Sequence, residues 1–495
     1  MGEEKSFFFE PSFNLAVKAR SRDERLTSDA GVILVREADH RLGLTESLAS
    51  RLADPRHPEK IRYKLVELLR ERIFAQVLGY TPADDLDRLA HDPALRLAAW
   101  DRPGDRVLEE RLASQPTQSR LLRILASPLS NREALRSALP EWVGRHLRAS
   151  GRDHAVGRGT IDVDSFPVVA RGLQEGSGYN GHYKQRVYHP LVAGFAPGGD
   201  YGDRRVGDGF VHAVLRGGTV SSARGALRFI RNAVGKCSEF CRKPDVRFDS
   251  AFTNGAIMDA LTEDGTRFLG LLQRNKRLSK LAEPHLARPA GRPPREGYEK
   301  VVELGDYKAG PWKYHQRLVL VVVDKPDPKT GQLELWPHYF FLVTNWYQEE
   351  MNGWDLLNHY RRRGTFEDRI GEFSQGVSAN LSSPTFQENE VTFLLSLLAF
   401  NLGSMLRREL EVSTGTGWDL GRLQRTVLKA GARVVKKSRR LLLDVAAAVL
   451  PLWQRLIIRI GRWKLPERWH QPKGPTHRPW MPPPAHAHLH VVLRT

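Results

Sequence analysis

The sequence predicts an α/β fold, in which a mixed sheet flanked by helices carries a β-rich insertion and follows an all-helical N-terminal domain. Residues 1 to about 155 show helical periodicity, whereas from Gly157 onward short runs of Val, Ile, Phe and Tyr alternate with Gly-rich turns, which is typical of strands. A helical stretch over 221–235 then separates two groups of predicted strands. This order is the one expected of a sheet with a helical crossover.

The N-terminal region, 1–155, is expected to consist of amphipathic helices. Apolar residues recur every four positions beneath a charged face at Ile61, Leu65, Leu69, Ile73 and Val77. Breaks at Pro, Gly and Asn separate four helical segments, which we place at 58–80, 82–99, 105–126 and 129–148. A basic helical region of this kind could bind DNA, dimerise or simply pack, and helical periodicity alone does not choose among them.

Predicted strands follow in two blocks. The first block, 156–275, forms the first part of the α/β domain, with strands expected at 159–164, 187–195, 210–216, 245–249 and 267–273 and a second helix at 254–264. The second block, 276–345, is interpreted as a β-rich insertion, with strands expected at 300–304, 316–323 and 333–344. Residues 346–410 then complete the α/β domain and end in an apolar helix over 387–408.

The C-terminal part of the chain is basic. Within the region 411–465, residues 433–445 fit either a hairpin or a helix. Residues 466–495 are rich in Pro, Trp and His, and this composition predicts a poorly ordered tail.

Charge and cysteine usage indicate the kind of partner and the compartment. The chain carries 76 Lys+Arg against 57 Asp+Glu, a formal net charge of +19, which favours a polyanionic partner such as nucleic acid. Nonspecific stickiness and an anionic membrane surface are the alternatives. The only cysteines, Cys237 and Cys241, fit packing thiols in a reducing cytoplasm. The N-terminus lacks the apolar core of a signal peptide, so we expect a cytoplasmic protein with no membrane role.

Two aspartates close predicted strands. Asp162 and Asp164 lie two apart, so both point to the same face, and Asp164 is preferred as a ligand because it lies nearer the carboxyl end of its strand. Asp249 follows another strand and precedes a turn. Each taken singly also fits a turn or a helix N-cap.

A third acidic residue, Glu367, lies in the string Tyr360 to Asp368 (YRRRGTFED). We expect Gly364 to separate two helices, with Thr365 and Asp368 forming a capping box that makes Glu367 a first-turn carboxylate. Two strand-end aspartates and one helical glutamate can form a carboxylate cage for two divalent metal ions.

These residues resemble the signature of DDE transposases from bacterial insertion sequences, the Tyr-Arg-Glu-Lys type, and more narrowly the thirteen-eighty insertion-sequence family. Supporting strings cover 79–95, 112–120, 179–183 and 247–252. The resemblance implies a ribonuclease-H-like core in which Asp164, Asp249 and Glu367 hold two Mg²⁺ ions, with Mn²⁺ as a substitute. It implies a nucleoid-associated bacterial enzyme that cuts double-stranded DNA at terminal inverted repeats and joins the 3′ ends to target DNA, acting as a homodimer on DNA.

The same resemblance suggests four residues that contact DNA, and the sequence departs from the family signature at one position. Tyr360 and Arg363 match the signature Tyr and Arg, which are expected at phosphates near the cut. The signature Lys should follow Glu367 by seven residues, but Ser374 stands there, and Arg369 is a candidate replacement. Trp346 is the candidate for stacking on a flipped base. A nuclease without strand transfer, and a catalytically impaired relic that binds the repeats and represses, remain alternatives.

Overall fold

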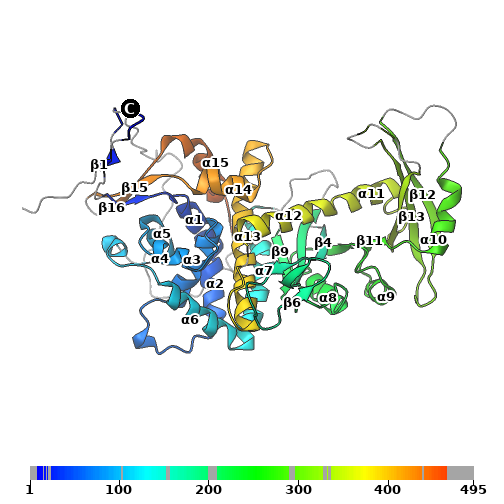
Figure 1. The fold of residues 1–495 in the computed structure, drawn as a ribbon, viewed down its shortest axis with the longest axis horizontal. Helices are drawn as coiled ribbons and strands as arrows, with labels where there is room; N and C mark the ends of the chain where they lie inside the picture. Colours follow the sequence, from blue (N-terminus) through cyan, green and yellow to red (C-terminus); the bar gives the residue numbers. More distant parts are fainter. Residues whose placement is uncertain are drawn as a thin grey trace, which may run out of the picture.

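A mixed sheet extends from a helical unit, which contains the N-terminal helices, to three long strands that form its far part (Figure 1). The computed structural model describes residues 8–9, 11–14, 16–17, 19–20, 24–101, 104–151, 157–198, 209–288, 296–326, 330, 332, 336–378, 380–437 and 440–464. The predicted tail, 466–495, lies outside the described residues.

The sheet has eight strands in the order β12-β13-β14-β11-β10-β4-β8-β9. The first strand of the domain, β4, is central: β8 pairs antiparallel on one side and continues into antiparallel β9, while β10 and then β11 pair parallel on the other. This arrangement is that of a ribonuclease-H-like core, so the predicted fold class is confirmed. The core strands are β4 (Arg158–Ser165), β8 (Leu191–Gly198), β9 (Gly209–Val214), β10 (Lys243–Phe248) and β11 (Phe268–Leu272).

The strands expected in the β-rich segment extend this same sheet. They pair antiparallel with one another, and β14 joins them to β11. Their Val-rich and Leu-rich runs are buried in β13, as expected of a strand covered on both faces. The three strands are β12 (Tyr298–Tyr307), β13 (Gln316–Asp324) and β14 (His338–Thr344).

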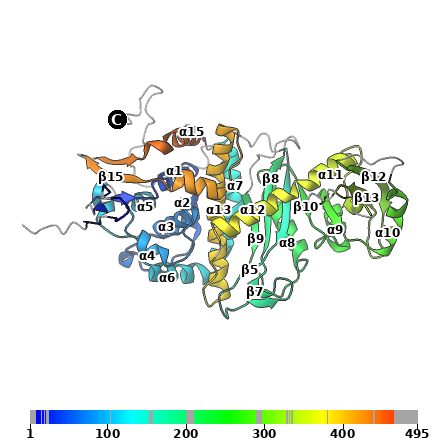
Figure 2. The ribbon, with the colours of Figure 1, turned by 45° about the horizontal axis from the view of Figure 1, so that its top comes forward.

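Alternation along β4 and β8 divides the two faces of the sheet. Ile161, Val163 and Phe195 pack in one apolar cluster with α8 (Ala226–Cys237) and α9 (Gly255–Glu263). The positions between them, Asp162, Asp164 and Gly194, therefore point to the opposite face. Two helices cross that face, as Figure 2 shows: α11 (Gly353–Arg361) and α12 (Arg363–Gly376).

Helix α13 (Phe386–Thr414) joins the sheet to the helical unit. It is long and apolar enough to cross a membrane by composition, but its apolar stretch is wholly buried within the protein, where it serves as a core helix. Asn401 accepts a hydrogen bond from the Phe210 backbone N–H and donates one to the Phe210 carbonyl, each at 2.8 Å. These two bonds fasten α13 to the edge strand β9.

The helical unit surrounds the other side of α13. Apolar side chains from the N-terminal helices, α13 and the C-terminal helix form one continuous core. The main helices are α1 (Val32–Leu42), α2 (Leu44–Arg51), α3 (Leu65–Val77), α4 (Asp85–Leu89), α5 (Pro93–Ala99), α6 (Gln115–Ala126), α7 (Leu129–Ala149) and α15 (Leu450–Gly461).

The C-terminal basic region folds back on the N-terminal part of the chain. Strands β15 (Ala432–Lys437) and β16 (Arg440–Val445) form an antiparallel hairpin, and β15 also pairs with β3 (Leu26–Thr27). The hairpin alternative for 433–445 is therefore confirmed. Cys237 and Cys241 are buried free thiols, as expected of packing residues.

Several predicted boundaries were wrong. Helix α3 begins at Leu65, because the 3₁₀ turn Pro58–Lys60 precedes it. The strand expected over 187–195 is interrupted by Pro190, which has no N–H to donate, and divides into β7 (Gln185–Tyr188) and β8. Helix α8 starts at Ala226, after Gly225, whose φ of 77° is left-handed and ends the preceding turn.

Packing between α12 and the sheet gives a stability prediction. A Cβ at Gly194 would lie 2.2 Å from the Phe366 ring, so Gly194→Ala should push α12 outward and lower the free energy of unfolding by about 1–3 kcal/mol. Gly371, also in α12, has nothing within 4 Å of an added Cβ, so Gly371→Ala should raise the free energy of unfolding by about 0.5–1 kcal/mol. Urea unfolding measures both. If the wild type and Gly194→Ala unfold at the same urea concentration, the contact between Phe366 and Gly194 does not hold α12 against the sheet.

Candidate active site

The fold brings the three predicted carboxylates to one edge of the sheet. Asp164 lies near the carboxyl end of β4, and Asp249 immediately follows β10. Because β4 and β10 are adjacent and parallel, both strands end at the same edge. Glu367 reaches that edge from α12, which crosses the sheet above them.

One guanidinium lies among the three carboxylates. Arg363 Nη2 is 2.6 Å from Asp164 Oδ2 and 3.9 Å from Asp249 Oδ2. Arg363 Nη1 pairs with Glu367 Oε1 one helical turn away on α12. The Asp164 side chain is 15% exposed and the Glu367 side chain 54%, so the site is buried at β4 and open at α12.

Burial and mutual repulsion perturb the site's electrostatics. The pKa of Asp164 is raised to about 6: burial is the largest cause, the charge of Arg363 opposes the rise, and the charges of Asp249 and Glu367 add to it. Burial also raises the pKa of Tyr360 to about 12, which keeps its phenol protonated. A carboxylate held in this way binds a cation at neutral pH but carries a proton in mild acid.

The two aspartates of β4 lie in different surroundings. Asp162 is 4% exposed, and both of its oxygens accept hydrogen bonds from Arg247, at 2.6 and 2.7 Å. Both oxygens of Asp162 are thus engaged within the sheet, whereas Asp164 Oδ2 lies 2.6 Å from Arg363 at the sheet edge.

The prediction that a new helix, capped by Thr365, begins after Gly364 was wrong. Helix α12 begins at Arg363, Gly364 lies inside it, and no side chain caps its N-terminus. The break from α11 is a single turn residue, Arg362, so Thr365 is not a cap. Glu367 consequently lies in the second turn, four residues after Arg363, and this spacing places the two side chains on one face.

Two of the predicted DNA contacts, Arg369 and Trp346, lie away from the carboxylates. Arg369 pairs with Glu372 and also lies near Glu411. Burial raises the pKa of Glu411, and the charges of Arg407 and Arg369 partly oppose that rise. Two residues from Glu367, Arg369 lies about 200° around the helix, on the opposite side. Ser374, at the place of the signature Lys, donates to the Ile370 carbonyl at 2.9 Å and adds no charge.

Trp346 is also buried rather than displayed. It is 3% exposed, and the guanidiniums of Arg158 and Arg267 lie 5.3 and 5.8 Å from its ring centroid. A base could not stack on this ring without displacing them. Tyr360, in contrast, is half-buried, and the Arg363 and Asp249 charges both act on its phenol.

Tyr183 was missed as a site residue. Burial raises the pKa of its phenol, and the charges of Asp164 and Asp249 raise it further, which places Tyr183 near both. It lies in the turn between β6 (Gly178–Asn180) and β7, where Lys184 has a φ of 53°. In the sequence, Tyr183 stood out only as part of the string 179–183, which supported the family resemblance but indicated no chemical role for this residue.

The donor set fits Mg²⁺ in its chemistry. Three carboxylates already converge on one cationic group, and hard oxygen donors are what Mg²⁺ prefers. The Arg363 guanidinium lies between them, and among the residues that the structure describes, no group of three or more His, Cys, Asp or Glu side chains is close enough together to hold a metal ion. Arg363 and a metal ion would therefore compete for the same oxygens.

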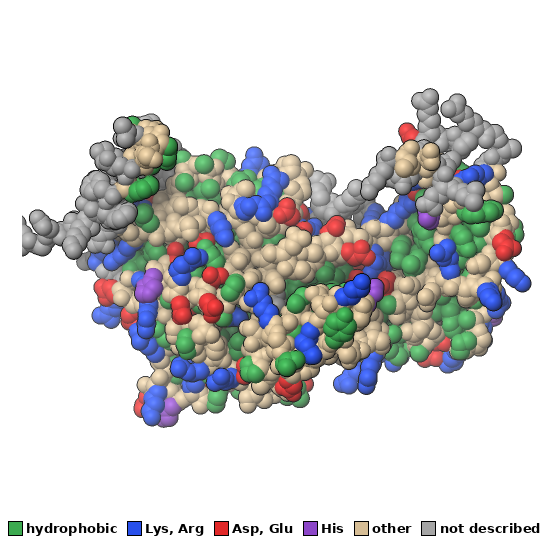
Figure 3. Space-filling view, in the orientation of Figure 1, with side chains coloured by type: hydrophobic (Ala, Val, Ile, Leu, Met, Phe, Trp, Pro, Cys, Tyr) green, Lys and Arg blue, Asp and Glu red, His purple; other side chains and the backbone are tan. Residues whose placement is uncertain are grey.

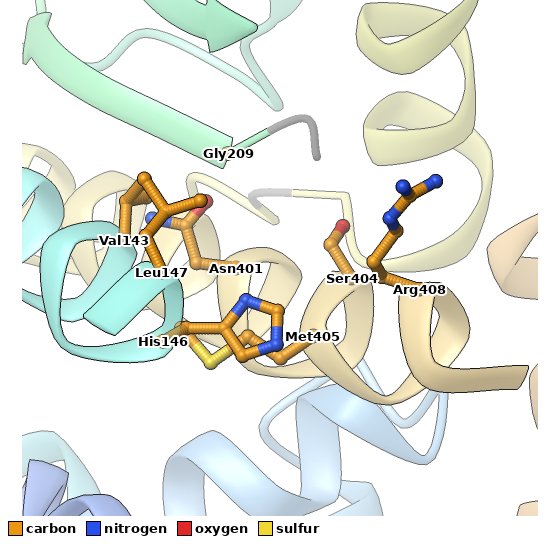
Figure 4. A pocket seen from close by; sticks show the side chains of 8 residues that line it. All are labelled: Val143, His146, Leu147, Gly209, Asn401, Ser404, Met405 and Arg408. Carbon is orange, nitrogen blue, oxygen red and sulfur yellow. The ribbon is translucent and has the colours of Figure 1, made fainter. Parts of the chain in front are cut away.

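Other surface features are separate from this site. A small pocket between α7, β9 and α13 is lined by both apolar and polar side chains, among them Leu147, Met405 and His146 (Figure 4), and none of the three carboxylates lines it. His146 lies 3.3 Å from Glu409, which Arg459 also contacts at 2.6 Å. Lys and Arg side chains are scattered over the face shown in Figure 3 rather than gathered in one stripe.

Comparison with known proteins identifies the family. The family model described as Transposase DDE domain group 1 matches residues 9–460, which is nearly the whole chain. The chain belongs to this family of DDE transposases. Among solved structures, one similar to it is a piggyBac transposase synaptic complex with hairpin DNA, at 11% identity and a TM-score of 0.41, covering 80% of this chain and 79% of that one. A comparison with curated proteins found no match.

Removing Arg363 should reveal the competition between its guanidinium and a metal ion. In the presence of a chelator, Arg363→Ala leaves three carboxylates facing one another and should lower the free energy of unfolding by on the order of 3 kcal/mol. Mg²⁺ should restore much of that loss, so its effect on the melting temperature should be larger than in the wild type. Arg361→Ala, which removes an exposed arginine paired with Glu299, is the matched control. Equal Mg²⁺ shifts in all three proteins would contradict the competition.

Asp164 should make stability depend on pH when no metal is bound. The folded protein holds this proton more tightly than the unfolded chain, since the pKa is about 6 against 3.8. The free energy of unfolding should therefore fall as pH rises from about 4 to 6 and remain lower above that range. Asp164→Asn should abolish this fall and be more stable at pH 8 by up to about 3 kcal/mol. Asp368→Asn, at an exposed position of α12, should retain it. Denaturant titrations with a chelator at each pH measure the difference.

Proposed function

We propose that this protein is the transposase of a bacterial insertion sequence, which binds terminal inverted repeats, cuts DNA strands there and joins the 3′ ends to target DNA. The observation that carries the proposal is the convergence of Asp164, Asp249 and Glu367 on one cationic group at the carboxyl edge of a ribonuclease-H-like sheet. Membership of a DDE transposase family over residues 9–460 supports the same reaction.

Asp164, Asp249 and Glu367 would hold Mg²⁺, with Mn²⁺ as a substitute. Two such ions supply an activated water or hydroxyl nucleophile, a stabilised leaving oxygen and charge neutralisation at phosphorus. The protein's own contribution is to hold the three carboxylates on rigid elements, two at strand ends and one in a helix. The exposure of Glu367 leaves the site open on the α12 side, where a DNA strand would enter.

Arg363 and Tyr360 would act on the DNA strand at this site. With Asp164, Asp249 and Glu367 holding metal ions, the Arg363 guanidinium would be free to bind a phosphate through two parallel hydrogen bonds. The Tyr360 phenol, protonated because of its pKa of about 12, is a hydrogen-bond donor beside it. Ser374 offers no charge at the place of the signature Lys, so phosphate contacts should depend more heavily on Arg363.

The remaining parts of the proposal concern partners and organisation. The net charge of +19 supports double-stranded DNA as the partner, and pairing of two transposon ends would require a homodimer on DNA. We assign DNA binding or dimerisation to the helical region 1–155 and catalysis to 156–275 and 346–410. The protein would work at the nucleoid in the bacterial cytoplasm.

Cleavage of terminal-repeat DNA tests the reaction and the site together. With Mg²⁺ or Mn²⁺ the wild type should give nicked and then joined strands, and Asp249→Asn or Glu367→Gln should reduce cleavage by roughly three orders of magnitude or more. Asp368→Asn, next to Glu367 but exposed, should cleave normally. Gel analysis of end-labelled DNA measures both steps.

The same assay distinguishes the alternatives. Cleavage that survives either substitution would overturn the assigned site. Nicking without joining would indicate a nuclease, and binding of the repeats without nicking would indicate a repressor.

A further inference from the structure

A second group of charged side chains lies beneath the carboxylates, in the interior of the sheet. Arg247 of β10 donates two hydrogen bonds to Asp162 of β4, from Nε at 2.6 Å and from Nη2 at 2.7 Å. Arg247 is 2% exposed and Asp162 is 4% exposed, so this is a buried ion pair with the planar, two-bond geometry that arginine makes with a carboxylate.

The pair extends to the helix above the sheet. Arg247 Nη1 donates to the backbone carbonyl of His359 in α11. The His359 ring Nε2 lies 3.0 Å from Asp245 Oδ2, and Thr160 donates to the other oxygen of Asp245 at 3.3 Å. His359 is 2% exposed and Asp245 is 4% exposed. Strand β4, strand β10 and helix α11 are thus tied by one buried polar network.

The network and the carboxylate site share the same three segments. Asp162 lies two residues before Asp164, and Arg247 lies two residues before Asp249. Since side chains two apart on a strand share a face, Asp162 lies next to Asp164 on the same face of β4, and Arg247 is the last residue of β10 on that face before Asp249. His359 lies one turn before Arg363 and two turns before Glu367, along two helices separated by the single residue Arg362.

Stability alone does not account for this arrangement. Withdrawing two charges from water is costly, and a buried ion pair can often be replaced by apolar side chains of similar volume without loss of stability. What apolar side chains cannot reproduce is direction, because two parallel hydrogen bonds fix both the spacing and the rotation of the strands that carry them. The backbone carbonyl of His359 adds the helix to that fixed frame.

We propose that Asp162, Arg247, His359 and Asp245 are positioning residues, which set the relative placement of Asp164, Asp249 and Glu367. The network holds the two strand ends and α11–α12 in register, so it sets where the three carboxylates lie relative to one another. This inference rests on the proposed function of the same site, and it concerns the side chains next to the carboxylates rather than the carboxylates themselves.

Replacement of the whole ion pair separates positioning from stabilisation. Asp162→Leu/Arg247→Met removes both charges together, so the melting temperature of the full-length protein should stay close to the wild type. Mn²⁺ binding, measured by titration with electron paramagnetic resonance, should weaken by roughly 10–100-fold, and cleavage of terminal-repeat DNA should fall by at least as much. Mn²⁺ affinity at unchanged stability is the quantity that a purely stabilising role would not alter.

A matched ion pair in the outer strands provides the control. Arg317 of β13 donates to Glu303 of β12 at 3.0 and 2.6 Å and to the Met351 backbone carbonyl at 2.8 Å, so it has the same chemistry as Arg247. It lies on strands that carry none of the three carboxylates. Glu303→Leu/Arg317→Met should leave Mn²⁺ affinity unchanged.

Conservative variants decide the outcome if the double variant does not fold. His359→Gln can still donate to Asp245 and should retain most of the Mn²⁺ affinity, whereas His359→Leu should lose it. Arg247→Lys keeps the charge but not the two-bond geometry, and it should also bind Mn²⁺ more weakly. Folded variants that bind Mn²⁺ as tightly as the wild type would overturn the positioning role. If the wild type binds Mn²⁺ but cuts no DNA, the proposed function fails while the binding comparison still tests the network.

Discussion

The parallel pairing of β4 with β10 is the constraint on which the rest of the site depends. Its register sets Arg247 opposite Asp162, so two charged residues that would each be costly to bury meet as one hydrogen-bonded pair. The same register brings the two strands to a common end, which is where Asp164 and Asp249 lie. Antiparallel pairing would have placed these two carboxylates at opposite ends of the sheet, and a one-residue slip would have turned one of them to the other face.

Helix α12 completes the site because the sheet leaves room for it. Gly194 on β8 has no side chain, and the Phe366 ring occupies the space above it, which holds the next residue, Glu367, close to the sheet edge. The α11–α12 pair is fastened a second time through the His359 carbonyl and ring. Apolar contact thus sets the distance of the helix from the sheet, while directional hydrogen bonds set its position along the strands. The resulting cluster of like charges is tolerated because Arg363 lies within it, and the raised pKa of Asp164 records the remaining cost of burying those charges.

Local patterns predicted much of the fold and the strand ends at which two of the candidate carboxylates lie. The strand ends at Asp164 and Asp249 were identified correctly, because an alternating apolar run followed by a turn is visible in a few consecutive residues. The prediction for Glu367 was less accurate: Gly364 and Thr365 suggested a helix start, yet packing of Phe366 against Gly194 keeps both residues inside the helix. The burial of Trp346 could not be predicted from the sequence, since Trp346 packs in an apolar cluster with residues far away in the chain, such as Leu269 and Val319. Tyr183 was overlooked for the same reason, because its proximity to the aspartates arises from a hairpin in a different segment.

The sequence by itself determined the class of fold, the strand ends before Asp249 and at Asp164, and the positive net charge, because each depends on composition or on neighbours within a few positions. Only the tertiary structure decided which side chains touch. It buries Asp162 against Arg247, directs Arg363 into the carboxylates, and places Arg369 and Trp346 away from them. These outcomes depend on the register between strands and on how a helix sits on a sheet, and both are fixed by contacts between residues far apart in the chain.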